Sequence, residues 1–446
     1  MTELKRALST FDLTMIAIGG TIGSGIFLTP SLVAQQLPSP EWMLAVWTIG
    51  GITTLCGALT FAELGGMLPH AGGMYVYLTE AYGKLAGFLF GWSYLLVVNT
   101  GGIAALSIAF ATYLGYFFPL GPVGIQAVAI IGLATVTFLN ITGVRAGGVF
   151  SDVFTILKLA GIAGLIVLGF GWGSESLLSS EMNNEPAGLS GAVAAAMIGV
   201  LWSYGGWQHA SFTAGEAKNA SRSVPIAMTV GALVVTFVYL LTNIAYLLLL
   251  SPGEISASSR VAADAVGTLL GPLGGSAIAL AIFISTFGST GIYTLTVPRV
   301  YFAMAKDGVF FRRVGEIHPR FQTPMFAILL QSTWALVLIL FWGTFNELIS
   351  YVVFTDWIFF GLTAFAVFVL RRTRPGTARP YRTLGYPITP LIFVGTAVWF
   401  VLNTLIEKPA QAWAGLAFLS IGIPVYYFWK TKNLTPEGKS NDDKAN

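Results

Sequence analysis

The chain has 446 residues, of which 55% are hydrophobic and 10% are charged, with a formal net charge of +3. Its mean hydropathy is +0.75, which excludes a soluble globular domain. Apolar runs near the ~20 residues needed to cross a bilayer recur along the chain. We therefore expect an all-α polytopic membrane protein that forms a single membrane domain over residues 1–446. The first apolar run follows the N-terminus without a small-residue cleavage site, so no removable signal peptide is expected.

The apolar runs predict twelve spans. These cover residues 12–36, 41–67, 84–117, 122–141, 147–171, 189–217, 225–250, 272–304, 324–342, 346–370, 388–406 and 410–430. With a cytoplasmic N-terminus, 20 of the 23 Lys and Arg residues lie in or beside inner segments. Positive charge favours the cytoplasmic side. We therefore predict a multi-pass protein of the plasma membrane with both termini cytoplasmic, including a polar tail at 431–446.

A glycine-rich stretch interrupts the first span. Residues 19–25 read Gly-Gly-Thr-Ile-Gly-Ser-Gly, and each glycine costs a helix roughly 1 kcal/mol relative to alanine. Backbone groups freed by unwinding survive at membrane depth only inside protein or beside a cavity. A break would expose N–H groups on one side and carbonyls on the other, which suits a zwitterion. The alternative is close helix packing, because Gly19 and Gly23 form a G-x-x-x-G pair.

A second interruption lies five spans later, at 203–207, which reads Ser-Tyr-Gly-Gly-Trp. Because five is odd, the second set of five spans enters the membrane from the opposite side. We expect inverted repeats at 10–172 and 188–371, followed by two extra helices at 387–430. Matching interruptions in two halves are the best sequence pointer to a transporter's central site, so the pair favours binding over packing. The carbonyls of 201–203 would face a cation.

Three shorter features lie on the inner side. The amphipathic connection 68–83 predicts a helix along the membrane interface. Glu63, at the end of the second span, is expected to act as a cap or to pair locally with a loop cation, with proton coupling as the alternative. Five arginines before the eleventh span are expected to act as a topological anchor: Arg371, Arg372, Arg374, Arg379 and Arg382.

Four motifs carry a family resemblance. GGTIGSGIF in span 1, ELGGMLPHAGGMYVYLTEAYG after span 2, LWSYGGWQHASFTAGEAKN in span 6 and RVYFAMAKDG after span 8 resemble the amino acid–polyamine–organocation superfamily. Within it they resemble the L-type amino acid transporter family. The resemblance covers spans 1–10 and implies the leucine-transporter fold, with broken helices 1 and 6 and transport by alternating access.

The resemblance also implies a substrate site. Backbone and hydroxyl groups at three positions would hold the substrate α-carboxylate: Thr21, Ser24 and Gly25. Carbonyls at three others would take the α-ammonium, and the first of these would also close over the substrate: Trp202, Ser203 and Gly205. Two more residues are expected to border the side-chain pocket: Asn99 and Tyr293.

Lys158 lies in the middle of the fifth span, where an ammonium costs several kcal/mol unless it is paired, so it should face the interior. In sodium-coupled relatives of this fold a cation bridges spans 1, 5 and 8, and the resemblance implies that Lys158 replaces it. The alternative is a structural charge that donates to the carbonyls of the break. The resemblance assigns Tyr239 to work with this lysine. Ser285 and Ser289 are expected to bond their own helix backbone and are not assigned to a metal site.

These observations predict a sodium-independent transporter of neutral L-amino acids that works by exchange or by proton coupling. The alternative is a polyamine or cationic amino acid antiporter, which needs a carboxylate in the pocket, and Asp356 is the candidate. A receptor on the same scaffold would bind amino acid without moving it.

An enzyme is not expected, because His70, His209 and His318 fall on separate elements and no acid–base or metal cluster is visible. His209 is expected to be an ordinary, hydrogen-bonded histidine. No cofactor and no nucleic acid partner is predicted. The expected partners are the amino acid substrate and the bilayer, while an accessory subunit or homo-oligomer is left open.

Overall fold

The computed structural model describes residues 4–174, 188–341, 345–407 and 409–432. Its regular elements in these ranges are helices, apart from one backbone bridge between Leu8 and Ala217. The predicted tail lies outside the described residues from 433 onward. The elements, including the π-helical turn η1 and the 3₁₀ turns η3 and η4, are α1 (Thr10–Thr21), α2 (Gly25–Gln36), α3 (Pro40–Met67), α4 (Met74–Tyr82), α5 (Lys84–Ser93), η1 (Tyr94–Val98), α6 (Asn99–Leu114), α7 (Pro122–Thr142), α8 (Val144–Trp172), α9 (Leu189–Ser203), α10 (His209–Phe212), η3 (Ala214–Glu216), α11 (Ala220–Leu249), α12 (Pro252–Ala257), α13 (Val261–Leu270), α14 (Pro272–Thr296), α15 (Pro298–Lys306), η4 (Arg312–Gly315), α16 (Met325–Phe341), α17 (Phe345–Thr373), α18 (Ile388–Glu407) and α19 (Pro409–Lys432).

Ten helical segments of the described part are long and apolar enough to cross a membrane. The prediction of a polytopic, helical membrane protein is therefore supported. The ranges expected for the sixth and ninth spans hold shorter apolar helices, α9 with 15 residues and α16 with 17.

The second half of the sixth span differs from the prediction of a helix up to residue 217. Only the four-residue α10 and the short turn η3 follow the interruption. The hydroxyl of Ser211 donates to the Gln208 carbonyl, and that of Thr213 lies 3.2 Å from the Ala210 carbonyl. Such side-chain bonds compete with the helical backbone pattern, so the chain turns here instead of continuing as a helix.

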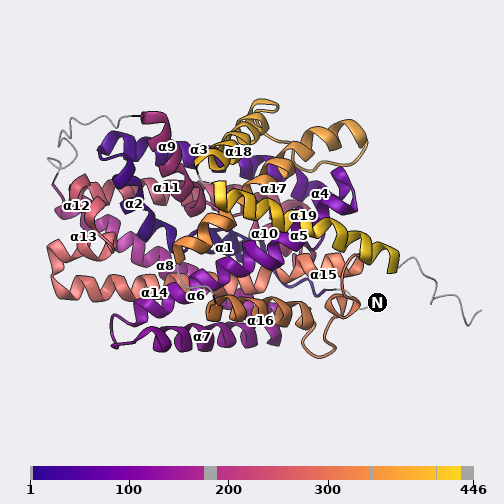
Figure 1. The fold of residues 1–446 in the computed structure, drawn as a ribbon, viewed down its shortest axis with the longest axis horizontal. Helices are drawn as coiled ribbons and strands as arrows, with labels where there is room; N and C mark the ends of the chain where they lie inside the picture. The colour runs from indigo at the N-terminus through magenta and orange to yellow at the C-terminus, as the bar shows by residue number, and fades with distance from the viewer. Residues whose placement is uncertain (1–3, 175–187, 342–344, 408, 433–446) are drawn as a thin grey trace, which may run out of the picture.

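The spans differ in how far they are buried by other helices, and so in how much of their surface can contact lipid. In an apolar 18-residue stretch of Thr10–Gln36, which holds α1 and α2, 89% is buried, whereas in the matching stretches of the last two spans 28% and 22% is buried. Figure 1 shows α1 in the middle of the bundle, with α7 and α16 along one edge and α3 and α18 along the other. α1 packs against α8, α11 and α14. The interrupted first span therefore lies at the centre of the helix bundle.

The inner connection forms α4 as a helix, as predicted. Glu63, at the end of α3, pairs with Arg371 at 2.6 Å and with Arg379 at 3.3 Å, which confirms the expected ion pair. Arg374 pairs with Glu80 of α4. Three members of the arginine cluster therefore join the end of α17 to α3 and α4, and its role as a topological anchor stays a prediction.

A second ion pair is fully buried. Arg299, at the start of α15, donates from Nε and Nη2 to the two carboxylate oxygens of Glu216 at 2.7 and 2.8 Å, and both side chains have zero exposure. The carbonyl of Glu216 also accepts the N–H groups of Ala7 and Leu8. This pair therefore ties the N-terminal segment to the end of the sixth span and to α15.

We predict that Glu216→Gln strongly destabilises the protein. Removing one partner of a buried ion pair leaves an uncompensated charge and costs about 3–5 kcal/mol. Glu80→Gln, which breaks a partly exposed pair, should cost less than about 1 kcal/mol. Thermal unfolding of the purified protein in detergent checks both changes. Equal shifts in melting temperature for the two variants would contradict the prediction.

Candidate functional site

The first interruption is present. α1 ends at Thr21 and α2 begins at Gly25, with residues 22–24 between them. A Cβ atom on Gly19 would collide with the side chains of Thr155 and Ile292, whereas one on Gly23 would meet only ordinary contacts. Gly19 therefore serves close helix packing, and Gly23 lies in the unwound segment. The break and the close packing are therefore both present, each at one glycine of the pair.

Lys158 of α8 reaches the carbonyls that the break leaves free. Its side chain is 1% exposed. Its Nζ atom lies 2.9 Å from the Gly19 carbonyl, 2.6 Å from the Ile22 carbonyl and 2.8 Å from the Ser289 hydroxyl. An ammonium has three donors, and all three find an acceptor here. Lys158 therefore faces the interior, as expected, and satisfies the carboxyl-terminal end of α1.

Two serines of α14 complete this contact. The Ser285 hydroxyl lies 3.1 Å from the Gly23 carbonyl, and the Ser289 hydroxyl lies 2.9 Å from the Gly19 carbonyl. The expectation that they bond only their own helix is wrong for Ser285, and for Ser289 it is incomplete, because Ser289 also lies 3.1 Å from the Ser285 carbonyl. The serine hydroxyls donate to the free carbonyls at the end of α1 because these carbonyls have no helical partners of their own. Helices α1, α8 and α14 therefore meet in one polar cluster.

The second interruption lies between α9 and α10, which leaves residues 204–208 outside both helices. Gly206 has φ = +132°, a conformation that favours glycine. A Cβ atom on Gly206 would strike the backbone of Gly20 and Thr21. The two interruptions therefore touch backbone to backbone.

Tyr239 of α11 joins the same two helix ends. Its hydroxyl lies 3.1 Å from the Thr21 carbonyl and 3.0 Å from the Ser203 carbonyl, and its side chain is fully buried. Both carbonyls belong to the last turns of helices, α1 and α9. No hydrogen bond joins Tyr239 to Lys158 in the part of the chain described, so each residue serves different carbonyls of the α1 terminus.

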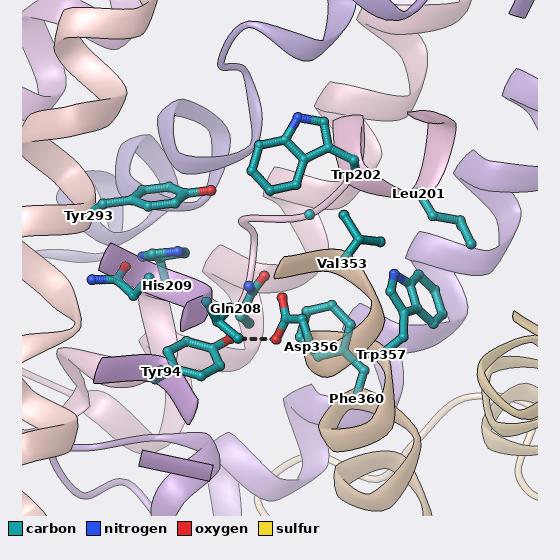
Figure 2. A pocket seen from close by; sticks show the side chains of 13 residues that line it. Tyr94, Leu201, Trp202, Gln208, His209, Tyr293, Val353, Asp356, Trp357 and Phe360 are labelled. Atoms are coloured by element: carbon teal, nitrogen blue, oxygen red, sulfur yellow. Dashed lines mark hydrogen bonds between the residues drawn. The ribbon is translucent and has the colours of Figure 1, made fainter. Parts of the chain in front are cut away.

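A small cavity of about 30 Å³ lies beside the second interruption. This volume is far below the ~300–1,000 Å³ of ligand-binding pockets, so the cavity must widen to admit an amino acid. Four of the predicted site residues line it: Asn99, Trp202, Gly205 and Tyr293. Figure 2 shows Trp202 and Tyr94 on opposite sides of the space, with Asp356 of α17 pointing its carboxylate between them.

The other predicted substrate residues do not line this cavity. The Thr21 hydroxyl donates to the Ala17 carbonyl, and the buried Ser24 hydroxyl has no hydrogen-bond partner among the described residues. A Cβ atom on Gly25 would collide with Ser203, whose hydroxyl lies 2.9 Å from that of Thr29. The start of α2 and the end of α9 therefore pack directly against each other.

Several lining residues were not predicted. Asp356 was identified only as the acid that an alternative substrate would need, and its Oδ1 atom accepts the Tyr94 hydroxyl at 2.8 Å. Gln208 lies within the second interruption, where its Oε1 atom accepts the Gly206 N–H at 2.8 Å. Proximity to the glycine pair is a signal that could have identified Gln208. Tyr94 sits in the π-helical turn η1, which the apolar pattern of the third span does not reveal.

His209 lies against the cavity wall as an ordinary histidine, as predicted. Its Nδ1 atom lies 2.6 Å from the Thr296 hydroxyl, and its ring stacks on Tyr293 with a centroid separation of 4.2 Å. Among the described residues, no group of three or more His, Cys, Asp or Glu side chains could hold a metal ion.

The sequence profile of the amino acid permease family matches residues 8–426. The chain belongs to this family. It is 34% identical to the serine/threonine exchanger SteT of Bacillus subtilis (strain 168), over 96% of this chain and 98% of that protein. It is 33% identical to large neutral amino acids transporter small subunit 2 of Mus musculus, over 96% of this chain and 82% of that protein.

The b(0,+)-type amino acid transporter 1 of Mus musculus is a further relative of this permease, 29% identical over 96% of the permease and 88% of the relative. The resemblance to the amino acid–polyamine–organocation superfamily and its L-type branch is therefore confirmed. The permease is a multi-pass membrane protein that acts in amino acid transport. Its relatives are transporters, not enzymes.

We predict that Gly206→Ala abolishes transport by this permease. Alanine would need a left-handed backbone, at a cost of roughly 1–2 kcal/mol, and its methyl group would also separate the two interruptions. Gly83 shares a positive φ, at +91°, but a Cβ atom there meets nothing within 4 Å. Gly83→Ala therefore carries the backbone strain alone and should keep most activity. Amino acid exchange in proteoliposomes measures both, and similar losses would contradict the role of the contact.

Proposed function

We propose that this permease is a sodium-independent transporter of neutral L-amino acids that works by alternating access, by exchange or proton coupling. The observation that supports it most is the position of the Lys158 ammonium on the carbonyls of the broken first span. A cation that joined α1, α8 and α14 would need these same oxygen atoms. The side chain therefore supplies the positive charge that a sodium ion would otherwise bring.

We propose the leucine-transporter fold as the scaffold, with twelve spans and inverted repeats at residues 10–172 and 188–371. The spans at 387–430 are then additions outside the repeats. Two interruptions five spans apart that touch at their glycines support this arrangement. Both termini are proposed to be cytoplasmic and the membrane to be the plasma membrane, because positive residues gather on that side.

The two helix ends suit the two charges of an amino acid. The first turn of α2 has N–H groups without helical partners and the positive end of a helix dipole, which favours a carboxylate. The end of α9 presents carbonyls, which favour an ammonium. We therefore propose that Thr21, Ser24 and Gly25 hold the α-carboxylate, and the buried, unpartnered hydroxyl of Ser24 supports this.

We propose that the carbonyls of Trp202, Ser203 and Gly205 take the α-ammonium. The indole of Trp202 covers the cavity (Figure 2). Asn99 and Tyr293 would border the substrate side chain, because both line the same cavity. Tyr239 would act as a coupling residue, since its hydroxyl contacts the last turns of both broken helices.

We predict that exchange persists in sodium-free buffer and that Lys158→Ala lowers it by more than about tenfold, because backbone groups left unpaired at membrane depth cost several kcal/mol. Lys306→Ala, at an exposed lysine outside the site, is the matched control and should retain activity. Counterflow of radiolabelled amino acid in proteoliposomes measures both, with gel filtration confirming that the variants fold. Strict dependence on sodium would overturn the proposal.

A second candidate function is a polyamine or cationic amino acid antiporter. Asp356 lines the cavity, and in the described part of the chain no lysine or arginine pairs with it. Among the described residues, the Tyr94 hydroxyl donates to its carboxylate. A carboxylate in a membrane interior is costly unless a cation or a proton neutralises it. A cationic substrate would supply that charge, whereas a neutral substrate requires that the carboxyl carry a proton.

We predict that neutral amino acids compete for uptake and that Asp356→Asn, which mimics the protonated carboxyl, retains their transport. Asp264→Asn, at an exposed acid outside the cavity, is the control for removing one negative charge. Uptake of a panel of serine, leucine, lysine and putrescine separates the candidates. If the unaltered protein prefers lysine or putrescine and Asp356→Asn switches it to neutral substrates, the antiporter is correct.

A further inference from the structure

A second, larger cavity of about 650 Å³ opens at the end of the molecule that carries the N-terminal segment. Its walls come from four places: the N-terminal segment, the junction of α7 and α8, the connection before α11, and the loop between η4 and α16. Five cationic side chains line it: Lys5, Arg6, Arg145, Lys218 and Arg320.

The positive charge of this cavity is largely uncompensated. All five cations are exposed, and none forms an ion pair within the described residues. The one carboxylate of the lining is Asp12. Its Oδ2 atom already accepts the Ser9 N–H at 2.6 Å in the capping box of α1. Since arginine and lysine side chains are strong donors to phosphate oxygens, the cavity suits a phosphate-bearing anion.

The cavity also borders the apolar surface of the bundle. Val149 of its lining is 55% exposed, and one turn further along α8 Val153 is 47% exposed. Ile156 continues this apolar track at 50%, and Phe11 of α1 is 54% exposed. A soluble phosphate makes no apolar contacts with such a track, whereas an acyl chain can pack along it.

We propose that this cavity binds the headgroup of an anionic phospholipid, with an acyl chain along the exposed face of α8. Anionic lipids concentrate in the cytoplasmic leaflet, and basic pockets between helices on that side bind their headgroups. The predicted orientation puts the cavity in that leaflet. The site is distinct from the cavity beside the two interruptions and from the substrate that it would bind.

The bound lipid would act on transport through the N-terminal segment. The N–H groups of Ala7 and Leu8 donate to the Glu216 carbonyl, and the Lys218 N–H donates to the Leu8 carbonyl. A phosphate that contacts Arg6, Arg145 and Arg320 together would hold this segment against α8 and the η4–α16 loop. The lipid therefore stabilises the conformation in which the N-terminal segment lies against α8, and changes the rate of exchange.

The test compares two double variants of the full chain. Arg145→Gln with Arg320→Gln removes two cations from the cavity. Arg312→Gln with Arg313→Gln removes two exposed arginines from the same end of the molecule, outside the cavity, and is the matched control. Native mass spectrometry of the purified protein measures retention of phosphatidylglycerol, with inorganic phosphate as the competitor. Exchange in phosphatidylcholine vesicles with and without phosphatidylglycerol provides the second readout.

The cavity variant should bind phosphatidylglycerol about 25-fold more weakly, since each of its two missing juxtamembrane cations contributes a factor of roughly five. It should also lose the effect of the lipid on exchange while keeping its rate in phosphatidylcholine. The control variant should change by less than about twofold. Equal losses in the two variants would overturn the proposal, because general surface charge would then explain binding. Full displacement by millimolar phosphate would also overturn it, in favour of a site for a soluble anion.

Discussion

The contact of the Lys158 ammonium with the Gly19 and Ile22 carbonyls is the interaction on which the rest of the structure depends. A helix that ends at mid-bilayer leaves carbonyls that lipid cannot satisfy. Here one side chain from α8 satisfies two of them, and Ser285 and Ser289 of α14 supply further donors. Without these groups, α1 would gain by continuing as a helix through residues 22–24, and the helix ends within the first span would disappear.

The second constraint is that the two interruptions cannot move independently. Gly206 lies against the backbone of Gly20, and the Tyr239 hydroxyl contacts the last turns of both α1 and α9. A movement that tilts α1 therefore displaces the end of α9 as well. In the function that we propose, this coupling lets one substrate, held between both helix ends, control access from either side of the membrane.

The helices, the two interruptions and the inward orientation of Lys158 could all be predicted from the sequence, because glycine content, apolar length and a lone charge are local signals. Four residues of the cavity lining were predicted, through the family resemblance: Asn99, Trp202, Gly205 and Tyr293. The others could not be. Tyr94, Gln208 and Asp356 converge from three distant parts of the chain, and no periodicity within a span reveals which face meets another. The short second half of the sixth span was missed for a related reason, since hydroxyl-to-backbone bonds end it and not a glycine or proline.

The most direct test of the account is a structure of the permease with a bound neutral L-amino acid, determined in sodium-free buffer. We expect the carboxylate at the start of α2, the ammonium at the carbonyls that end α9, and the Lys158 ammonium still on the Gly19 and Ile22 carbonyls. An amino acid bound away from these helix ends, or first and sixth spans that run through without interruption, would contradict it.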